Sequence, residues 1–195
     1  MTRRLSKPVR EERELRILDF DLETLAAGFA DPNWVPQKIM CASWGWLGDD
    51  RTPEVRVCGP MGFFKDAPRK RMLEPLLKAI HQADMLIGHN IVRFDLPILN
   101  AECLRLGFGP LPEKLVHDTM NLVKTKGFKK GQDVLAGVLG VASEKQAMNW
   151  HQWQEAYAED GWKSIKSRCV RDVIQHKEMY GEIKPWLRPA RKWKP

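Results

Sequence analysis

The sequence predicts an α/β fold in which a mixed sheet is flanked by helices. Three apolar segments that are predicted as β-strands follow one another in the first third of the chain, joined by short turns, and this order is typical of an antiparallel meander. Two later apolar strands are each reached through a segment with helical spacing, and a helical crossover brings the chain back parallel to the first strand. With 195 residues the chain favours one domain with a sizeable core.

The expected strands are short and apolar. The three early strands are expected at residues 16–23, 38–47 and 54–58, and the polar joint GDDRTPE separates the second from the third. The alternation in EVRVC gives the third strand one exposed face. The two later strands are expected at residues 84–89 and 114–119.

Apolar residues recur at helical spacing before, between and after the two later strands. Gly107 and Gly140 end two of the helices, as glycine often does, and Pro185 ends the last. Pro75 is unfavourable inside the first helix and indicates an early turn or a kink. The expected helices cover residues 69–83, 95–106, 133–140, 149–157 and 162–183.

The composition argues against several classes of protein. The four cysteines form no CxxC pair and the five histidines form no HxxxH cluster, which argues against a zinc site and a disulfide framework, so any bound metal must have oxygen ligands. No apolar run approaches the roughly 20 residues of a membrane span, and the N-terminal MTRRLSKPVREEREL lacks the apolar core of a signal peptide. We therefore expect a cytoplasmic protein without a membrane partner.

The chain carries an excess of positive charge. The net charge is +7 and the pI is about 9.3, which is compatible with a polyanionic partner. KPWLRPARKWKP at the C-terminus and KTKGFKKG at residues 124–131 combine cations with aromatic rings, as surfaces for single-stranded nucleic acid do, although a solvated loop and a disordered tail can have the same composition. We expect a flexible N-terminal arm at residues 1–14, a domain at 15–184 and a basic tail at 185–195.

Carboxylates cluster where the first strand ends. The strand period of two places Asp19, Asp21 and Glu23 on one face of DFDLET, with Phe20 and Leu22 on the other. Adjacent buried carboxylates are costly unless a cation or hydrogen bonds compensate for their charge. A divalent metal with hard oxygen ligands explains the pattern, and a loop that holds the acids in water is the alternative.

Polar residues also follow the fourth strand, in the segment IGHNIVRFDLPIL. Asn90 and Asp95 lie just past the C-terminal end of this strand, where sites gather in open α/β sheets. Because Leu-Pro follows Asp95, this aspartate also has the sequence pattern of a helix N-cap. On the last helix, Asp172 could reach the same edge of the sheet; alternatively it is a solvated acid with Arg168 and His176 one turn away.

Together these segments resemble the three exonuclease motifs of the DEDD, or DnaQ-like, 3′–5′ exonuclease superfamily. FDLET carries Asp21 and Glu23, GHNIVRFD carries Asp95, and CVRDV carries Asp172, in the order and approximate spacing of that superfamily. The third motif is spaced as in polymerase-type proofreading domains and in small phage and bacterial ribonuclease H-like nucleases. The resemblance covers residues 15–184 and implies a ribonuclease H-like fold, with a mixed five-stranded sheet whose first three strands are antiparallel.

The resemblance also implies a site and a reaction. Two Mg²⁺ or Mn²⁺ ions would be bound, and the phosphodiester bonds of single-stranded or frayed nucleic acid, with DNA favoured, would be hydrolysed to nucleoside 5′-monophosphates. The implied partners are nucleic acid with a free 3′ end and replication or repair proteins. The implied catalytic and metal-binding acids are Asp21, Glu23, Asp95 and Asp172. The residues implied to contact the substrate are Leu22, Thr24, Asn90, Phe94 and Arg168.

The third motif departs from the superfamily pattern. A tyrosine four residues before the last aspartate, or a histidine five residues before it, orients the attacking water in that superfamily, and here these positions are Arg168 and Ser167. Arginine stays protonated and cannot act as a general base. His151 or Tyr157 could take this part, the reaction could proceed without a base, or the enzyme could be weak or inactive. One alternative function is therefore a nucleic-acid-binding module with a degenerate third motif. A 3′–5′ exoribonuclease is the other, because the sequence does not choose DNA over RNA.

For several other polar and aromatic residues a structural role is the preferred interpretation. We expect His89 to be hydrogen-bonded at the end of its strand, and Asp118 to cap a following helix together with Thr119. The large aromatic side chains are expected in the core rather than in a base-stacking surface. These aromatic residues are Trp44, Trp46, Trp150, Trp153 and Trp162.

Overall fold

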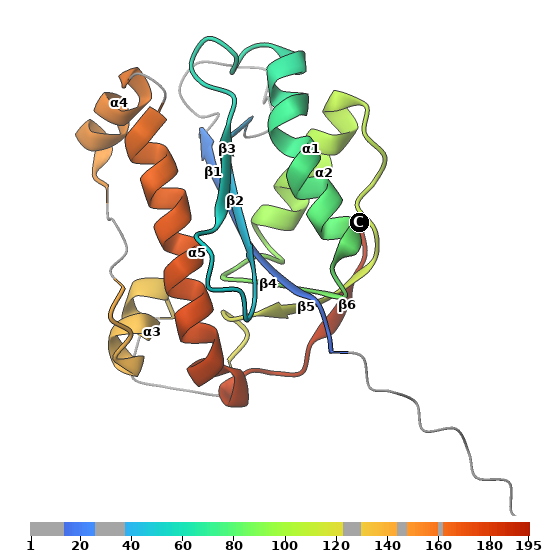
Figure 1. The fold of residues 1–195 in the computed structure, drawn as a ribbon, viewed down its shortest axis with the longest axis vertical. Helices are drawn as coiled ribbons and strands as arrows, with labels where there is room; N and C mark the ends of the chain where they lie inside the picture. Colours follow the sequence, from blue (N-terminus) through green and yellow to red (C-terminus); the bar gives the residue numbers. More distant parts are fainter. Residues whose placement is uncertain (1–13, 26–37, 123–129, 144–147, 160–161) are drawn as a thin grey trace, which may run out of the picture.

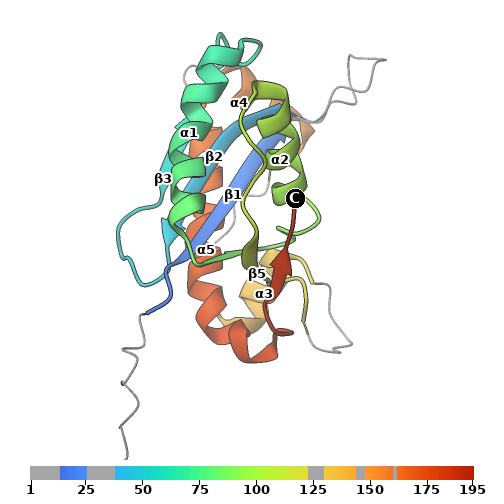
Figure 2. The same ribbon diagram turned by 90° about the vertical axis from the view of Figure 1, so that its right-hand side faces the viewer.

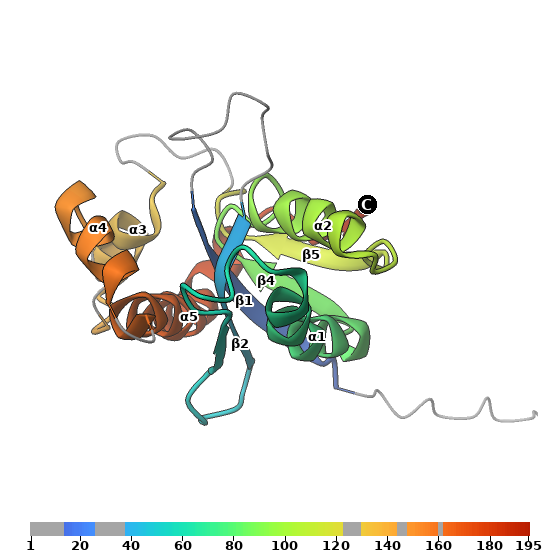
Figure 3. The same cartoon turned by 90° about the horizontal axis from the view of Figure 1, so that it is seen from above.

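A computed structural model of the chain describes residues 14–25, 38–122, 130–143, 148–159 and 162–195. It contains one six-stranded mixed sheet with the strand order β3-β2-β1-β4-β5-β6. Helices α1 and α2 cover one face of the sheet, and α5, accompanied by α3 and α4, covers the other (Figures 1 and 3). The predicted mixed sheet between two layers of helices is thus confirmed.

The directions of the first five strands agree with the prediction. Strand β2 pairs antiparallel with both β1 and β3, whereas β4 pairs parallel with β1 and β5 pairs parallel with β4. The bounds of the strands are β1 Ile17–Leu25, β2 Lys38–Trp46, β3 Glu54–Val57, β4 Met85–Gly88, β5 Lys114–Asp118 and β6 Arg191–Trp193.

The sixth strand corrects the expectation of five. Strand β6 lies at the edge of the sheet and pairs antiparallel with β5, so that Lys114 faces Trp193. The three residues RKW of β6 are too few to show an apolar alternation. Because two of them are charged, the sequence predicts that they belong to the basic tail. The prediction missed this strand because its pairing depends on the neighbouring edge of β5.

The helices lie close to their predicted positions. Helix α1 begins three residues before the expected start, and Pro75 lies within it. Proline cannot donate a backbone hydrogen bond within the helix. Burial of Leu73, Leu76 and Leu77 on either side of Pro75 stabilises the helix in spite of this loss. Gly107 ends α2 as predicted, and it adopts a left-handed conformation there. The bounds are α1 Asp66–Gln82, α2 Asp95–Leu106, α3 Gln132–Leu139, α4 Trp150–Ala158 and α5 Lys163–Ile183, and a 3₁₀ turn covers Lys184–Trp186.

One face of the central strand β1 is apolar, and the other carries carboxylates. Phe20 and Leu22 are buried in the core cluster that contains residues of α1 and α2. Asp19 and Glu23 are buried as well and interact with residues of α5. The predicted alternation is therefore confirmed, and the carboxylates of β1 lie between the sheet and the last helix.

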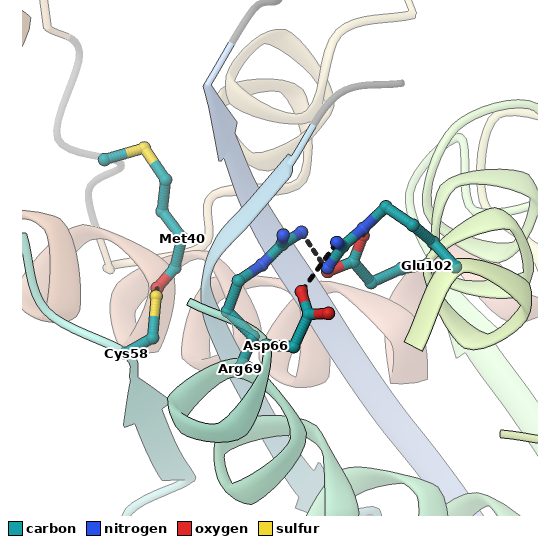
Figure 4. Close-up of polar contacts among 6 residues, drawn as sticks. Met40, Cys58, Asp66, Arg69 and Glu102 are labelled. Atoms are coloured by element: carbon teal, nitrogen blue, oxygen red, sulfur yellow. Dashed lines mark hydrogen bonds and ion pairs between the residues drawn. The ribbon is translucent and has the colours of Figure 1, made fainter. Parts of the chain in front are cut away.

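A buried ion pair joins the two helices of the apolar face. Arg69 of α1 bonds to Glu102 of α2 (Figure 4), and both side chains are only 1% exposed. Arg105 binds the same carboxylate and also reaches Asp66. Since α2 begins at Asp95, these contacts help to fix the helix that carries one of the candidate site residues.

The predicted core aromatics are only partly confirmed. Trp44 and Trp162 are buried, and Trp162 packs edge-on against Phe63. Trp46 and Trp153 are partly buried against core clusters. The described part of the chain does not include the side chain of Trp150, residues 123–129 of the basic KTKGFKKG segment, or the expected arm through residue 13.

Candidate metal centre

Three carboxylates meet where β1 ends beneath α5. Asp21 and Glu23 come from the strand and Asp172 from the helix, and one oxygen of each lies within 4.8 Å of the others. Glu23 and Asp172 are buried and Asp21 is half-buried. The sequence expectation that Asp172 reaches the acids of the first strand is thus met by the packing of α5 across the sheet, which Figure 1 shows.

The fourth predicted acid, Asp95, approaches β1 from the other helix layer. Its Oδ1 accepts a hydrogen bond of 3.2 Å from the backbone N–H of Leu22. The parallel pairing of β1 with β4 extends only to Asp19, and among the described residues no strand pairs with this edge of β1 beyond that point. There the carboxylate of Asp95 accepts the N–H of Leu22.

The interpretation of Asp95 as a helix N-cap is therefore wrong. Phe94 is the N-cap residue of α2, and it makes no side-chain capping bond. Asp95 is the first residue of the helix, and its carboxylate accepts the N–H of Leu22 on β1, while its own backbone N–H also acts to lower its pKa. A capping pattern in the sequence does not reveal a neighbouring strand, and here the buried strand donor is the partner of the carboxylate.

The charges of neighbouring acids affect the pKa of Asp95. Burial, followed by the negative charge of Asp21, raises the pKa of the Asp95 carboxyl well above its usual value, although the N–H of Leu22 works in the opposite direction. The four predicted acids are thus close enough for the charge of one to affect another. Such a group favours a bound cation, which would remove the repulsion.

Arg168 supplies positive charge to this cluster. Its Nε lies 2.7 Å from Glu23 Oε1, and its Nη2 lies 3.8 Å from Asp172 Oδ2. The guanidinium also lies over the ring of Trp153, 5.5 Å from the centroid. Burial lowers the pKa of Arg168, but the charges of Glu23 and Asp172 outweigh it and raise this pKa above its usual value. Arg168 is therefore a fixed cation and not a base.

The other residues predicted to contact the substrate lie in two places, on β1 and in the turn after β4. Leu22 is buried in the core, and Thr24 follows it on β1, half-buried, after a register shift. Asn90 and Phe94 lie in the turn between β4 and α2, where the N–H of Phe94 donates to Asn90 O. Asn90 has a φ of 61°, a left-handed conformation that asparagine tolerates better than most residues.

The two proposed replacements for the missing base have other surroundings. The ring of Tyr157 packs against Phe63 and Trp162. His151 is exposed on α4. Among the described residues, the recorded contacts of these two side chains do not include the carboxylate cluster.

His89 and Asp118 have structural roles, one of them different from the prediction. His89 Nδ1 lies 2.9 Å from Thr119 Oγ1, which confirms the expected hydrogen bond at the strand end. Asp118 accepts the N–H groups of Asn90 and Val92 as well as that of Met120. It therefore holds the turn after β4, where the sequence suggested a cap for the next helix.

A buried polar network lies beside the carboxylates and was not predicted. His176 of α5 bonds to Asp19 Oδ2 at 2.7 Å, and its Nε2 lies 2.9 Å from Thr119 Oγ1. The pKa of Asp19 is raised by burial, which outweighs the stabilising charge of His176. Because His176 is one turn after Asp172, this bond also orients the helix face that carries Asp172. The sequence signal was present, since Asp19 shares a strand face with Asp21.

Comparisons with known proteins bear on the fold. No protein-family model and no curated protein sequence matches the chain. A solved structure that is similar is the family B DNA polymerase from the hyperthermophilic archaeon Pyrobaculum calidifontis, with a TM-score of 0.65 and 20% identity over 89% of this chain. The chain spans only 25% of that polymerase. At this identity the comparison establishes a shared fold.

Among the described helices, none is long and apolar enough to cross a bilayer.

Proposed function

We propose that the chain is a metal-dependent 3′–5′ exonuclease of the DEDD class with a ribonuclease H-like fold. The observation that carries the proposal is the meeting of Asp21, Glu23 and Asp172 at one point, from segments near opposite ends of the chain. The similarity in fold to part of a DNA polymerase supports it as well, because that neighbour acts on nucleic acid. The favoured substrate is single-stranded or frayed DNA, and the proposed domain comprises residues 15–184 together with β6, which completes the sheet.

The carboxylate cluster fits a hard divalent cation. Two oxygens on one Mg²⁺ can be at most about 4.2 Å apart, because each Mg–O distance is about 2.1 Å. The three acids have oxygens within 4.8 Å of one another, so small side-chain movements suffice to bind a common ion. Carboxylate oxygens suit Mg²⁺ or Mn²⁺, and two such ions would neutralise the scissile phosphate and the attacking and leaving oxygens.

The protein's own residues would orient the substrate. Asp21, Glu23 and Asp172 would hold the ions, and Asp95 would act beside Asp21 while it fixes the edge of β1. Leu22 and Thr24 would contact the terminal nucleotide through backbone and hydroxyl groups, and Asn90 and Phe94 would line its pocket. These roles place the 3′ end between β1 and the turn after β4.

Arg168 favours a second candidate function. Its ion pairs with Glu23 and Asp172 occupy two of the acids that the ions would need, and no base stands at its position in the third motif. A nucleic-acid-binding module with weakened catalysis is consistent with these contacts. In an active enzyme, Arg168 would instead neutralise the acids before metal binding and then hold the scissile phosphate.

The decisive experiment uses single-stranded DNA and RNA of the same sequence, labelled at the 5′ end, with Mg²⁺ or Mn²⁺. A ladder of shortened products that is absent with Asp21→Asn and present with the exposed control Asp133→Asn supports the exonuclease, and the relative rates show whether DNA or RNA is preferred. Intact oligonucleotides with both metals would exclude the enzyme, and a retained shift on a native gel would then support the binding module.

A further inference from the structure

The C-terminal basic segment forms one wall of a groove. The groove has a volume of about 550 Å³ and lies at the edge of the sheet formed by β5 and β6, which run side by side in Figure 2. Its other wall is the turn after β4, which contributes Asn90 and Arg93. We call this feature the β5–β6 groove. Its cationic lining residues are Arg93, Lys130, Arg188, Arg191 and Lys192.

The groove has an excess of positive charge. Among its described lining residues the only acid is Asp118, and the oxygens of this side chain accept backbone N–H groups of Asn90, Val92 and Met120. Within the described part of the chain, no recorded ion pair joins the five cations of the groove to a carboxylate. Four of the five side chains are exposed and Lys130 is half-buried. The charge therefore remains available to an anionic partner.

Specific contacts fix the shape of the groove. His117 of β5 bonds through Nε2 to the carbonyl of Arg188 at 2.9 Å, and the N–H of Arg188 donates to Asn121 O. The pairing of β6 with β5 then places Arg191 beside Val116. Because backbone contacts hold the cationic wall in place, the groove is a built feature of the fold and not a collection of mobile side chains.

We propose that the β5–β6 groove binds the sugar–phosphate backbone of a single nucleic-acid strand. The cations would contact phosphates, and the half-buried ring of Trp193 in the lining offers a surface for a base. The amides of Asn90 and Asn121 can both donate to and accept from nucleotide edges, which an acidic peptide does not require.

The groove is connected to the carboxylate cluster by one short turn. Asn90 lines the groove, and Asp95, the first residue of α2 after the same turn, bonds to β1 beside Asp21. Asp95 is five positions after Asn90, so their Cα atoms are at most about 18 Å apart. A strand whose 3′ end reaches the acids can therefore continue into the groove; this route, unlike the binding itself, rests on the proposed exonuclease function.

The test measures binding without cleavage. Fluorescence anisotropy of labelled 12-nucleotide DNA and RNA is recorded with the full chain in a chelator, so that loss of nuclease activity cannot affect the result. The variant Arg188→Ala/Arg191→Ala/Lys192→Ala is compared with Lys65→Ala/Arg71→Ala/Lys78→Ala, which removes the same charge from exposed residues at and within α1. Circular dichroism verifies that each variant folds.

We expect the groove variant to bind at least tenfold more weakly and the control to stay within twofold of the parent protein. The slope of log K against log salt should fall by about 2, because each lost phosphate contact on a single strand contributes about 0.7. Arg93→Ala, on a different element, should weaken binding in the same direction and serves if the triple variant does not fold. Unchanged binding by the groove variants, or equal displacement of the strand by polyglutamate and by unlabelled DNA, would overturn the proposal.

Discussion

At the scale of single residues, Arg168 decides how the carboxylate cluster behaves without a cation. It contacts Glu23 and Asp172, and its side chain is only 14% exposed. Removing a partner of a buried ion pair leaves the remaining charge uncompensated, which is costlier than losing an exposed pair. A divalent ion in the cluster would compensate the same charges, so the effect of removing Arg168 should depend on metal.

We predict that Arg168→Ala lowers the free energy of unfolding by about 3 kcal/mol in a chelator, because Glu23 and Asp172 lose their cation. In saturating Mn²⁺ the loss should be much smaller. Denaturant titrations with and without Mn²⁺ measure both values. Arg171→Ala, an exposed residue of the same helix, should change the free energy by less than about 0.5 kcal/mol. An equal loss for Arg168→Ala in both conditions would contradict the metal centre.

Asn90 allows its backbone and side-chain roles to be separated. Since its φ is 61°, Asn90→Gly should keep the stability of the parent protein within about 0.5 kcal/mol, whereas Asn90→Ala should cost roughly 1 kcal/mol. Both variants lack the amide and should bind a single-stranded oligonucleotide equally weakly. Urea denaturation and fluorescence anisotropy provide the two measurements. Parental affinity in the glycine variant would show that the amide does not contact the strand.

At the scale of elements, the turn from β4 into α2 and the start of α2 are hydrogen-bonded to the two strands beside β4. Asp118 of β5 holds the backbone at its start, and Asp95 at its end bonds to β1. Local patterns predicted the strand and the helix on either side but not these contacts. The reason is that hydrogen bonds between elements distant in sequence leave no periodic signal.

The buried pair between α1 and α2 should be required for stability. We predict that Glu102→Gln lowers the free energy of unfolding by about 3–5 kcal/mol, because Arg69 would remain buried without its counter-charge. For a chain of this length the melting temperature should fall by roughly 6–20 °C. Asp66→Asn, which breaks only the more exposed pair with Arg105, should have a much smaller effect on the melting temperature. A similar loss in both variants, measured by calorimetry, would argue against a special role for the buried pair.

The junction of β5 with the C-terminal segment should weaken in acid. Burial lowers the pKa of His117 below its usual value of 6.5, in spite of the bond to Arg188 O. The unfolded chain therefore takes up a proton at a higher pH than the folded protein. The stability that His117 contributes is complete above about pH 6.5 and is lost as the pH falls towards the lower folded-state pKa.

We expect His117→Gln to reduce the loss of unfolding free energy between pH 7.5 and 5.5 relative to the parent protein. Denaturant titrations at several pH values measure this slope. His81→Gln, at an exposed histidine, should retain the parental slope. If His117→Gln also kept that slope, proton uptake by His117 would not contribute to it.

At the scale of the whole molecule, the candidate metal centre joins the two helix layers through the sheet. Asp172 belongs to α5 on one face, and Asp95 belongs to α2 near the other. A cation bound only by the folded arrangement must stabilise the entire fold by mass action.

We predict that Mg²⁺ or Mn²⁺ at about 100 times its dissociation constant adds about 2.7 kcal/mol to the free energy of unfolding. This corresponds to a rise in melting temperature of roughly 5–10 °C, which a chelator should reverse. Thermal denaturation followed by circular dichroism measures the shift. The variant Asp21→Asn/Asp172→Asn should show no such rise, and an equal rise would mean that the ions bind elsewhere.

Local periods and capping residues in the sequence predicted the strands and helices to within a few residues. The set of acids Asp21, Glu23, Asp95 and Asp172 came from the resemblance to the three exonuclease motifs, supported for Asp21, Glu23 and Asp95 by unusual charge in apolar segments. The folded arrangement was needed to show that Asp95 bonds to β1, that Arg168 pairs with two of the acids, and that β6 completes the sheet. Each of these is a contact between segments far apart in the chain, and its energy comes from satisfying a buried donor, a charge or a strand edge that only the folded neighbour presents.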